Sequence, residues 1–296
     1  MLLNIICLGV AFFTVTTVGS IANIFLFTFY MSNAFAEHKI SFLTLIFIQL
    51  TLVNSTVLIS KGVPQTLYGL GWNNFLDAVG CKVVFYIRRV SMGLSISLTC
   101  LLSTIQAITI SPDNSRWTKL KIRARQHTTA SCLFCWIFNL LIEIPIPVNS
   151  RGPKRSSNFT NAFDNIFCTS EHIMAFYLIM TTFRNVLCLG LMVLTSGYMV
   201  LLLYKHHQHV QYIWSNKLSP KKNPEIKVTQ TILLLMSTFV SFYLLDLILT
   251  LFLSYFDQKS AWMLSSAIFL SLCFPTISPF LLMPRLRRSS SKFWVM

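Results

Sequence analysis

Charged side chains are scarce in this sequence. They make up 11% of its 296 residues, and only nine of them are Asp or Glu. A soluble domain carries about 25% charged residues, so the deficit leaves too little polar surface to face water. Hydrophobic residues account for 54% of the chain. The shortage of charge therefore excludes an ordinary soluble protein and predicts an integral membrane protein.

Basic residues are missing from the start of the chain. No Lys or Arg precedes Lys39, and residues 1–36 carry no charge. A secretory signal peptide begins with a basic segment and has an apolar core of about 7–15 residues. The longer uncharged run at the start of this chain is instead predicted to be a first membrane span that the mature protein retains.

Seven apolar stretches follow one another along the chain. A membrane-spanning helix needs about 20 apolar residues, whereas the strands of a membrane barrel alternate over about 10 residues. The stretches are long enough for helices, so the sequence predicts an all-α bundle of seven transmembrane helices. The predicted receptor-like domain covers residues 1–283, and a short tail follows at 284–296. The predicted spans are residues 5–31, 40–60, 83–110, 128–148, 172–204, 228–256 and 261–283.

The positive charge is distributed unevenly. The net charge of +15 raises the alternative of a basic protein that binds nucleic acid. Most Lys and Arg residues, however, lie in the first, third and fifth connections and in the tail, which is the distribution of cytoplasmic segments in membrane proteins. We therefore predict an extracellular amino terminus and a cytoplasmic carboxyl terminus, with no nucleic acid as partner. Attraction of these basic loops to anionic lipids is expected as well.

The longest predicted outer loop carries a glycosylation signal. Asn158 is followed by Phe159 and Thr160, a triplet that accepts a glycan only on the luminal side. The charge distribution independently places it there. A second such triplet begins at Asn54, in the middle of a predicted span, and is expected to remain unmodified.

Two of the eight cysteines are predicted to lie at the outer surface. These are Cys81 and Cys168, and because the outer face is oxidising we predict a disulfide between them. It would hold the long outer loop over the third helix. The other six lie within spans, where a free thiol behaves as a small hydrophobe. This applies also to Cys132 and Cys135, whose spacing resembles a redox or metal pair.

The third predicted helix is expected to be central, because it carries two charges inside the membrane. Arg88 and Arg89 follow Cys81 by about two turns. A charge at the bilayer centre costs on the order of 2.5–3.5 kcal/mol, so it usually faces a partner or a water-filled cavity. Two accounts remain open. One is a structural ion-pair network that draws on the other intramembrane charges, Glu143, Arg184 and Asp246. The other is a ligand cavity lined by one of the two arginines.

Motifs of catalysis do not occur in the sequence. It has no phosphate-binding loop, nucleophile elbow or metal-binding helix pair, so we predict that the protein is not an enzyme and uses no cofactor or metal. His206, His207 and His209 stand beside Lys205, and a solvated basic face is the simpler interpretation. A small seven-helix transporter would be expected to show paired broken helices and an internal repeat, and neither is evident.

Several short strings then suggest a family. They occur in a fixed order as KGVPQT at 61–66, GCK at 80–82, QAITISP at 106–112, VLCLGLM at 186–192, TQTIL at 229–233 and SPF at 278–280. With these strings the chain resembles the mammalian vomeronasal type-1 receptors, a family of pheromone receptors in the G-protein-coupled superfamily. The resemblance extends over nearly the whole chain. A bitter-taste-type receptor is the nearest alternative among receptors.

The departures from related patterns are informative. Residues 105–107 read Ile-Gln-Ala where rhodopsin-like receptors carry Asp-Arg-Tyr, and Ser278-Pro279 replaces Asn-Pro. The vomeronasal receptors share both differences. Within that family, Arg184-Asn185 replaces a frequent Pro-Asp, and Arg88 stands where His is common. The resemblance therefore does not carry a ligand class over to this chain.

The resemblance also implies a mechanism and its residues. A small pheromone-like molecule would bind in the outer half of the bundle and activate an inhibitory-type G protein at the plasma membrane. The predicted ligand-binding residues are Arg88, Arg89, Met92, Tyr86, Arg184 and Asp246. The predicted G-protein contacts are Gln106, Arg116, Lys121, His209, Gln211 and Lys227.

Overall fold

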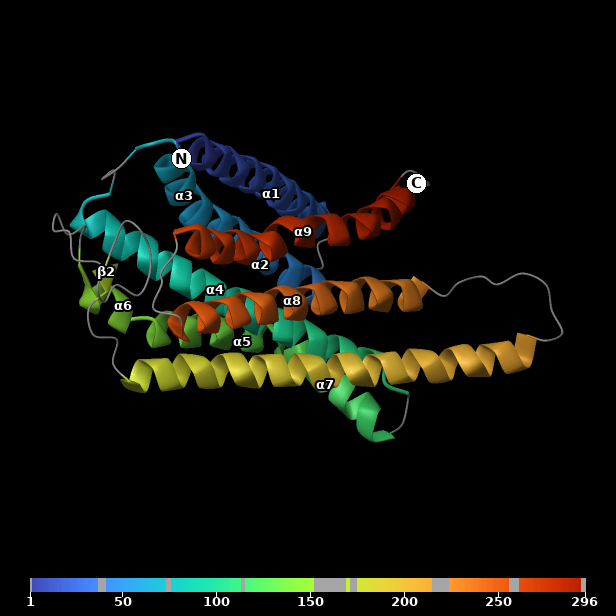
Figure 1. Ribbon diagram of the computed structural model, residues 1–296. Helices are drawn as coiled ribbons and strands as arrows, with labels where there is room; N and C mark the ends of the chain where they lie inside the picture. Colours follow the sequence, from blue (N-terminus) through green and yellow to red (C-terminus); the bar gives the residue numbers. More distant parts are fainter. Residues whose placement is uncertain are drawn as a thin grey trace.

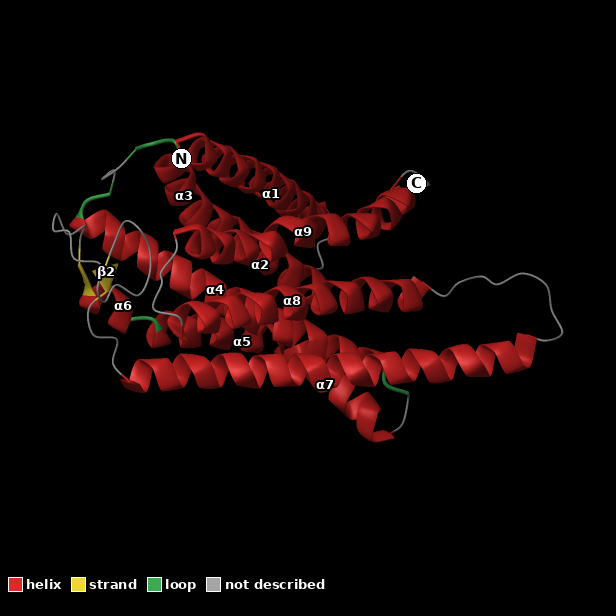
Figure 2. Cartoon of the chain, in the orientation of Figure 1, coloured by secondary structure: helices red, strands yellow, loops and turns green. Residues whose placement is uncertain are grey.

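The structure is a computed structural model, and it is almost entirely helical (Figures 1 and 2). It describes residues 2–36, 41–72, 76–112, 115–151, 169–170, 175–214, 224–255 and 261–293. The helices are α1 (Leu2–Ala36), α2 (Phe42–Val57), the π-helix η1 (Leu58–Gly62), α3 (Val63–Gly69), α4 (Ala78–Ile110), α5 (Ser115–Ile142), α6 (Pro145–Asn149), α7 (Ala175–Trp214), α8 (Pro224–Tyr255) and α9 (Ala261–Phe293). Two-residue strands β1 (Ser150–Arg151) and β2 (Thr169–Ser170) pair antiparallel.

Seven segments within the described residues are long and apolar enough to cross a membrane, which confirms the predicted fold class. They are Cys7–Ala36, Phe42–Gly69, Ala78–Ile110, Trp117–Val148, Ile179–Lys205, Thr229–Leu249 and Ser265–Met283. Helices also continue beyond the apolar runs: α7 projects past the rest of the bundle (Figure 1), and α9 continues to Phe293. Hydropathy marks where a helix leaves lipid, not where its backbone hydrogen bonds stop.

The structure places α4 at the centre of the bundle. In its apolar window 72% of the residues are buried, against 11% in that of α7. Asp77 starts the helix, since its side chain accepts a hydrogen bond from the Gly80 backbone at 2.7 Å. The two ends of the bundle take their names from this helix: the Cys81 end, where α4 begins, and the Ser111 end, where it stops. The amino-terminal end of α1 lies at the Cys81 end and the carboxyl-terminal end of α9 at the other (Figure 1).

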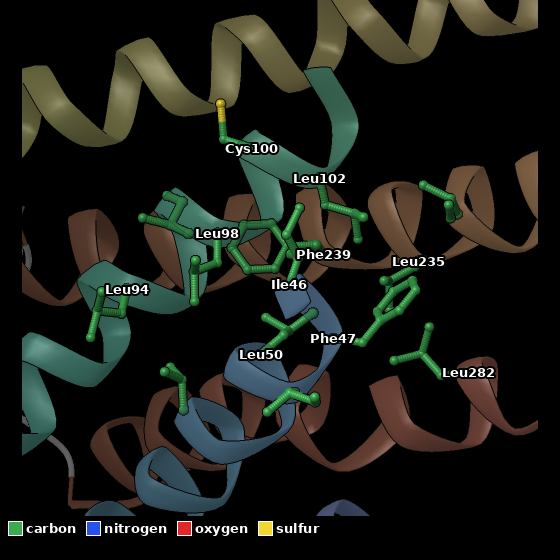
Figure 3. Packing of buried hydrophobic residues seen from close by; sticks show 14 of the residues in the cluster. Ile46, Phe47, Leu50, Leu94, Leu98, Cys100, Leu102, Leu235, Phe239 and Leu282 are labelled. Carbon is green, nitrogen blue, oxygen red and sulfur yellow. The ribbon is translucent and has the colours of Figure 1, made fainter. Parts of the chain in front are cut away.

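Apolar packing around α4 holds the middle of the bundle together. Leu94, Leu98 and Leu102 of α4 belong to one buried cluster with residues of the neighbouring helices (Figure 3). On the side of α8 and α9, the rings of Phe239 and Phe274 meet edge to face, with centroids 4.5 Å apart. Contacts of this kind add specific geometry to the burial of apolar surface.

The second span contains a π-helical segment that local pattern did not reveal. Pro64 has no backbone N–H, so a regular helix would leave one carbonyl of the preceding turn without its partner. The chain widens there into η1, and single π-turns of this kind are frequent at functional sites. Gly62 in this segment lies against α1: a Cβ atom there would stand 2.0 Å from Thr16 Oγ1. A larger side chain would force the two helices apart.

Proline also shapes α9. Pro279 lacks the N–H that would bond the carbonyl of Pro275. Asn23 of α1 replaces it, because its Nδ2 donates to Pro275 O at 2.8 Å and to Gly19 O at 2.8 Å. Asn23 is fully buried. A side chain from another helix thus satisfies the backbone group that proline leaves unpaired.

A second side-chain amide, that of Asn54, joins three helices close to the Asn23 contact. Asn54 of α2 donates to Ser278 Oγ at 2.9 Å and accepts from Ser95 Oγ of α4 at 3.1 Å. Asn54 is only 1% exposed. The triplet that begins at this residue therefore lies inside the bundle, as its position in the sequence predicted.

Candidate functional site

Charged side chains from several helices gather in the half of the bundle at the Cys81 end. Lys61 of η1 is buried and donates a hydrogen bond to Ser271 Oγ of α9. Lys61 and Arg88 both interact electrostatically with Asp246 of α8, which is half-buried. Two cations thus act electrostatically on one half-buried carboxylate. Intramembrane charges are costly and usually functional, so this cluster is a candidate ligand site.

A second charged group lies between α5 and α7. Pro145 disfavours helical geometry at the residue before it, and α5 ends at Ile142, so Glu143 stands at the turn into α6. Arg184 Nη1 donates to Glu143 Oε1 at 2.9 Å, and Tyr177 donates to the other carboxylate oxygen at 2.6 Å. The arginine and the glutamate are 7% and 1% exposed. Arg184 thus forms a buried ion pair with Glu143, two of the residues that the ion-pair account drew on.

The two adjacent arginines have different neighbours, as expected for helix positions about 100° apart. Arg88 lies over the ring of Phe85, with its guanidinium carbon 5.9 Å from the centroid. Arg89 interacts electrostatically with Tyr177 of α7. Both arginines are half-buried. Arg88 therefore belongs with Asp246, and Arg89 lies toward the Glu143 group.

The remaining predicted ligand residues lie on α4 in the same half. Tyr86 donates from its hydroxyl to the carbonyl of Leu140 at 3.0 Å, which links α4 to α5. Met92 is half-buried, one turn after Arg88. Of the six predicted ligand residues, the structure thus brings Arg88 and Asp246 into one cluster and engages Tyr86 and Arg184 in contacts between helices.

The cysteines divide into two groups. Cys81 is fully buried against Phe85, Ile146 and Tyr177 and is disulfide-bonded. Its predicted partner Cys168 lies outside the described residues, as does Asn158, so the disulfide pairing and the glycan stay predictions. Cys7, Cys100, Cys132, Cys135, Cys188 and Cys273 are free. Cys132 belongs to the main hydrophobic cluster and Cys135 packs against it, which agrees with the packing interpretation.

At the Ser111 end, polar contacts join α4 to α7 and α8. Gln106 Nε2 donates to Thr229 Oγ1 of α8 at 3.4 Å, and both side chains are buried. The hydroxyls of Ser111 and Tyr198 are 2.9 Å apart, and Trp117 stacks on the Tyr198 ring with centroids 6.2 Å apart. Lys121 is half-buried. The side chains of four other predicted contacts are not among those described: Arg116, His209, Gln211 and Lys227.

Comparison with known proteins resolves the class of the protein. The sequence model of the vomeronasal organ pheromone receptor family matches residues 6–295 of this chain. The chain belongs to this family. It is 40% identical to human vomeronasal type-1 receptor 2 over 272 residues, which cover 90% of this chain and 69% of that protein. It is 39% identical to human vomeronasal type-1 receptor 4 over 90% of both chains, and 35% identical to rat vomeronasal type-1 receptor 90 over 79% of this chain and 77% of the other.

Family membership confirms several predictions from the sequence. This member of the family is a chemosensory receptor of the G-protein-coupled kind, a multi-pass protein of the plasma membrane and not an enzyme. Its partners are in general terms a small-molecule ligand and a G protein. The membership sets aside the transporter and the bitter-taste-type receptor as alternatives.

Sequence reasoning did not single out Lys61 for the candidate site, for a definable reason. The predicted second span stopped at residue 60, whereas the helical segment continues to Gly69. Lys61 therefore falls just past the predicted span, near the outer end of the second helix, although it is 7% exposed inside the bundle. The sequence does contain a sign that the second span continues: Pro64 and apolar residues follow Lys61, and a single charge does not end a span. Asn139 and Tyr177, which contact the Glu143 group, gave no comparable signal.

Proposed function

We propose that this vomeronasal receptor binds a small molecule in the half of the bundle at the Cys81 end. The observation that supports this most is the cluster of Lys61, Arg88 and Asp246, in which Asp246 interacts with both cations. A ligand with hydrogen-bonding groups would exchange contacts with these side chains. Arg89, Met92 and Tyr86 of α4 line the same half and complete the proposed site.

The membrane orientation belongs to the same proposal. The Cys81 end faces the outside and the Ser111 end the cytoplasm, because the basic residues of the first, third and fifth connections gather at the latter. Residues 1–283 then form the receptor domain, and residues 284–296 lie in the cytoplasm. A disulfide from Cys81 to Cys168 and a glycan on Asn158 are part of this outer face.

The Ser111 end is the proposed site of an inhibitory-type G protein. Gln106 and Thr229 are buried against each other in the arrangement of the structure, so α4 and α8 are closed on each other. A ligand activates the receptor if it binds more tightly to an arrangement in which this end is open. Opening would expose Gln106, and the other proposed contacts of the G protein are Arg116, Lys121, His209, Gln211 and Lys227.

The experiment measures nucleotide exchange on an inhibitory-type G protein in membranes that contain the receptor. Panels of steroids and volatile compounds serve as ligands, and the glycan on Asn158 reports delivery to the surface. Arg88→Ala and Arg89→Ala are compared at equal surface expression with Lys82→Ala, a matched loss of charge near the start of α4. Ligand-dependent exchange with reduced potency in an arginine variant supports the site. Unchanged potency in both arginine variants contradicts it.

A further inference from the structure

The group between α5 and α7 forms a connected network, the α5–α7 clamp, which consists of Asn139, Glu143, Tyr177 and Arg184. Arg184 Nη1 donates to Asn139 Oδ1 as well as to Glu143 Oε1, both at 2.9 Å. Asn139 Nδ2 in turn donates to the carbonyl of Cys135 at 2.8 Å and to Ser97 Oγ of α4 at 3.2 Å. The clamp residues are almost completely buried, so their polar interactions operate in a low-dielectric interior.

This network lies where α5 and α7 otherwise have little contact. Helix α7 packs mainly on α4 and α8 and touches α5 only sparingly. Beneath the clamp, Gly93 of α4 leaves the space that the network needs: a Cβ atom there would stand 2.3 Å from Asn139 Oδ1 and 2.5 Å from Arg184 Nη1. The clamp therefore concentrates the interaction of α5 with α7 in one ion pair seated on the central helix.

A buried ion pair between two helices favours the arrangement that contains it. An arrangement that parts α5 from α7 at this level would separate the charge of Arg184 from that of Glu143 in apolar surroundings, and that is unfavourable. In the arrangement that contains the clamp, Gln106 and Thr229 are also buried against each other at the Ser111 end. The clamp and the contact between Gln106 and Thr229 are thus features of the same arrangement.

We propose that Glu143 and Arg184 are positioning residues that hold this receptor in its resting arrangement and set its ligand-independent activity. This inference rests on the proposed coupling to a G protein. It gives Arg184 a role that involves no ligand contact. Breaking the pair shifts the population toward the open form, and couplings of this kind typically change an equilibrium by about 5-fold to 150-fold.

The test uses the full-length receptor in membranes without added ligand. The variants are Glu143→Gln, Arg184→Gln and the exchange of the two charges, Glu143→Arg with Arg184→Glu. Tyr177→Phe removes one hydrogen bond to Glu143 while it keeps the ring, and Lys82→Gln is the control for loss of a positive charge. The first readout is ligand-independent nucleotide exchange on the G protein at equal surface density.

A second readout does not need a G protein. Cys135 and Cys188 lie one turn from Asn139 and Arg184, on α5 and α7, and both are half-buried. Their rates of alkylation by a membrane-permeant maleimide, measured by mass spectrometry, report how far the two helices separate. Both rates are expected to rise several-fold in each single variant of the ion pair. They should rise less in Tyr177→Phe and fall back toward the wild-type value in the charge exchange.

The outcomes separate the clamp from the coupling. Ligand-independent exchange that rises about fivefold or more, together with faster alkylation and recovery in the charge exchange, supports the proposal. Alkylation rates equal to those of the wild type in both single variants overturn the clamp. Faster alkylation with unchanged exchange, in membranes where ligand still stimulates exchange, overturns the positioning role. Faster alkylation where no variant or ligand ever stimulates exchange supports the clamp as a connection and counts against the proposed function.

Discussion

Substitution of Gly93 by alanine is expected to destabilise the receptor far more than a glycine-to-alanine change usually does. The new Cβ would lie 2.3 Å from Asn139 Oδ1, 2.5 Å from Arg184 Nη1 and 3.0 Å from Arg184 Cζ. These atoms cannot simply retreat, because Asn139 and Arg184 are hydrogen-bonded to each other and Arg184 is paired with Glu143. The substitution must therefore displace the whole clamp or the backbone of α4.

The magnitude follows from two contributions. Overpacking of a tight interior costs typically about 1–3 kcal/mol, and loss of a hydrogen bond to a charged group costs about 1.5–3 kcal/mol. The expected loss in stability is thus about 3–5 kcal/mol, from the lower and middle parts of these ranges. A chain of this size loses about 2 °C of melting temperature per kcal/mol, so we expect a fall of about 6–10 °C in detergent-solubilised receptor.

Helix α7 offers matched controls for this measurement. A Cβ atom at Gly190 or Gly197 would have nothing within 4 Å. Gly190→Ala and Gly197→Ala should raise stability slightly, by about 0.5–1 kcal/mol, because alanine loses less backbone entropy in a helix than glycine. The assay is thermal unfolding of purified receptor at one detergent concentration. A Gly93→Ala receptor that melts at the same temperature as these two controls would refute the steric argument and the clamp geometry behind it.

Three further predictions concern other parts of the receptor. Asn23→Leu removes the shorter of the two hydrogen bonds to the Pro275 carbonyl and leaves only that from Ser278 Oγ at 3.3 Å. It should cost about 1–3 kcal/mol, seen as a lower melting temperature, and an unchanged value would contradict the role of Asn23 in α9. Thr229→Val removes the acceptor of Gln106 without changing a predicted G-protein contact and should raise ligand-independent nucleotide exchange, whereas lower or equal exchange would count against closure at that end. Asn158→Gln should abolish a mobility shift on deglycosylation, and a shift that persists would contradict the proposed glycan.

The seven spans could be predicted from sequence because hydropathy and helix length are local quantities. Each apolar run must satisfy its own backbone hydrogen bonds in lipid, whatever it later packs against. The central place of α4 was expected from its two adjacent charges, which need partners or a cavity in different directions. The limits of the helices were less predictable, since helical hydrogen bonding continues past the membrane in α7, α8 and α9.

The partners of the buried charges could not be predicted in the same way. Arg88, Arg89, Glu143, Arg184 and Asp246 offered several combinations of opposite sign, and sequence separation does not choose among them. The choice depends on how α5, α7 and α8 are rotated and how closely they approach α4. Arg184 reaches Glu143 because Gly93 leaves room for the network between them.

By itself, then, the sequence determined that this chain is a membrane-embedded bundle of seven helices with charges in one half of its interior, because composition and periodicity act residue by residue. Tertiary structure alone decided which of those charges neutralise each other and which gather around Asp246. It also decided that Lys61 lies inside the bundle, because Pro64 and the π-turn before it redirect the second span instead of ending it. Such pairings depend on the packing of whole helices, which no local pattern encodes.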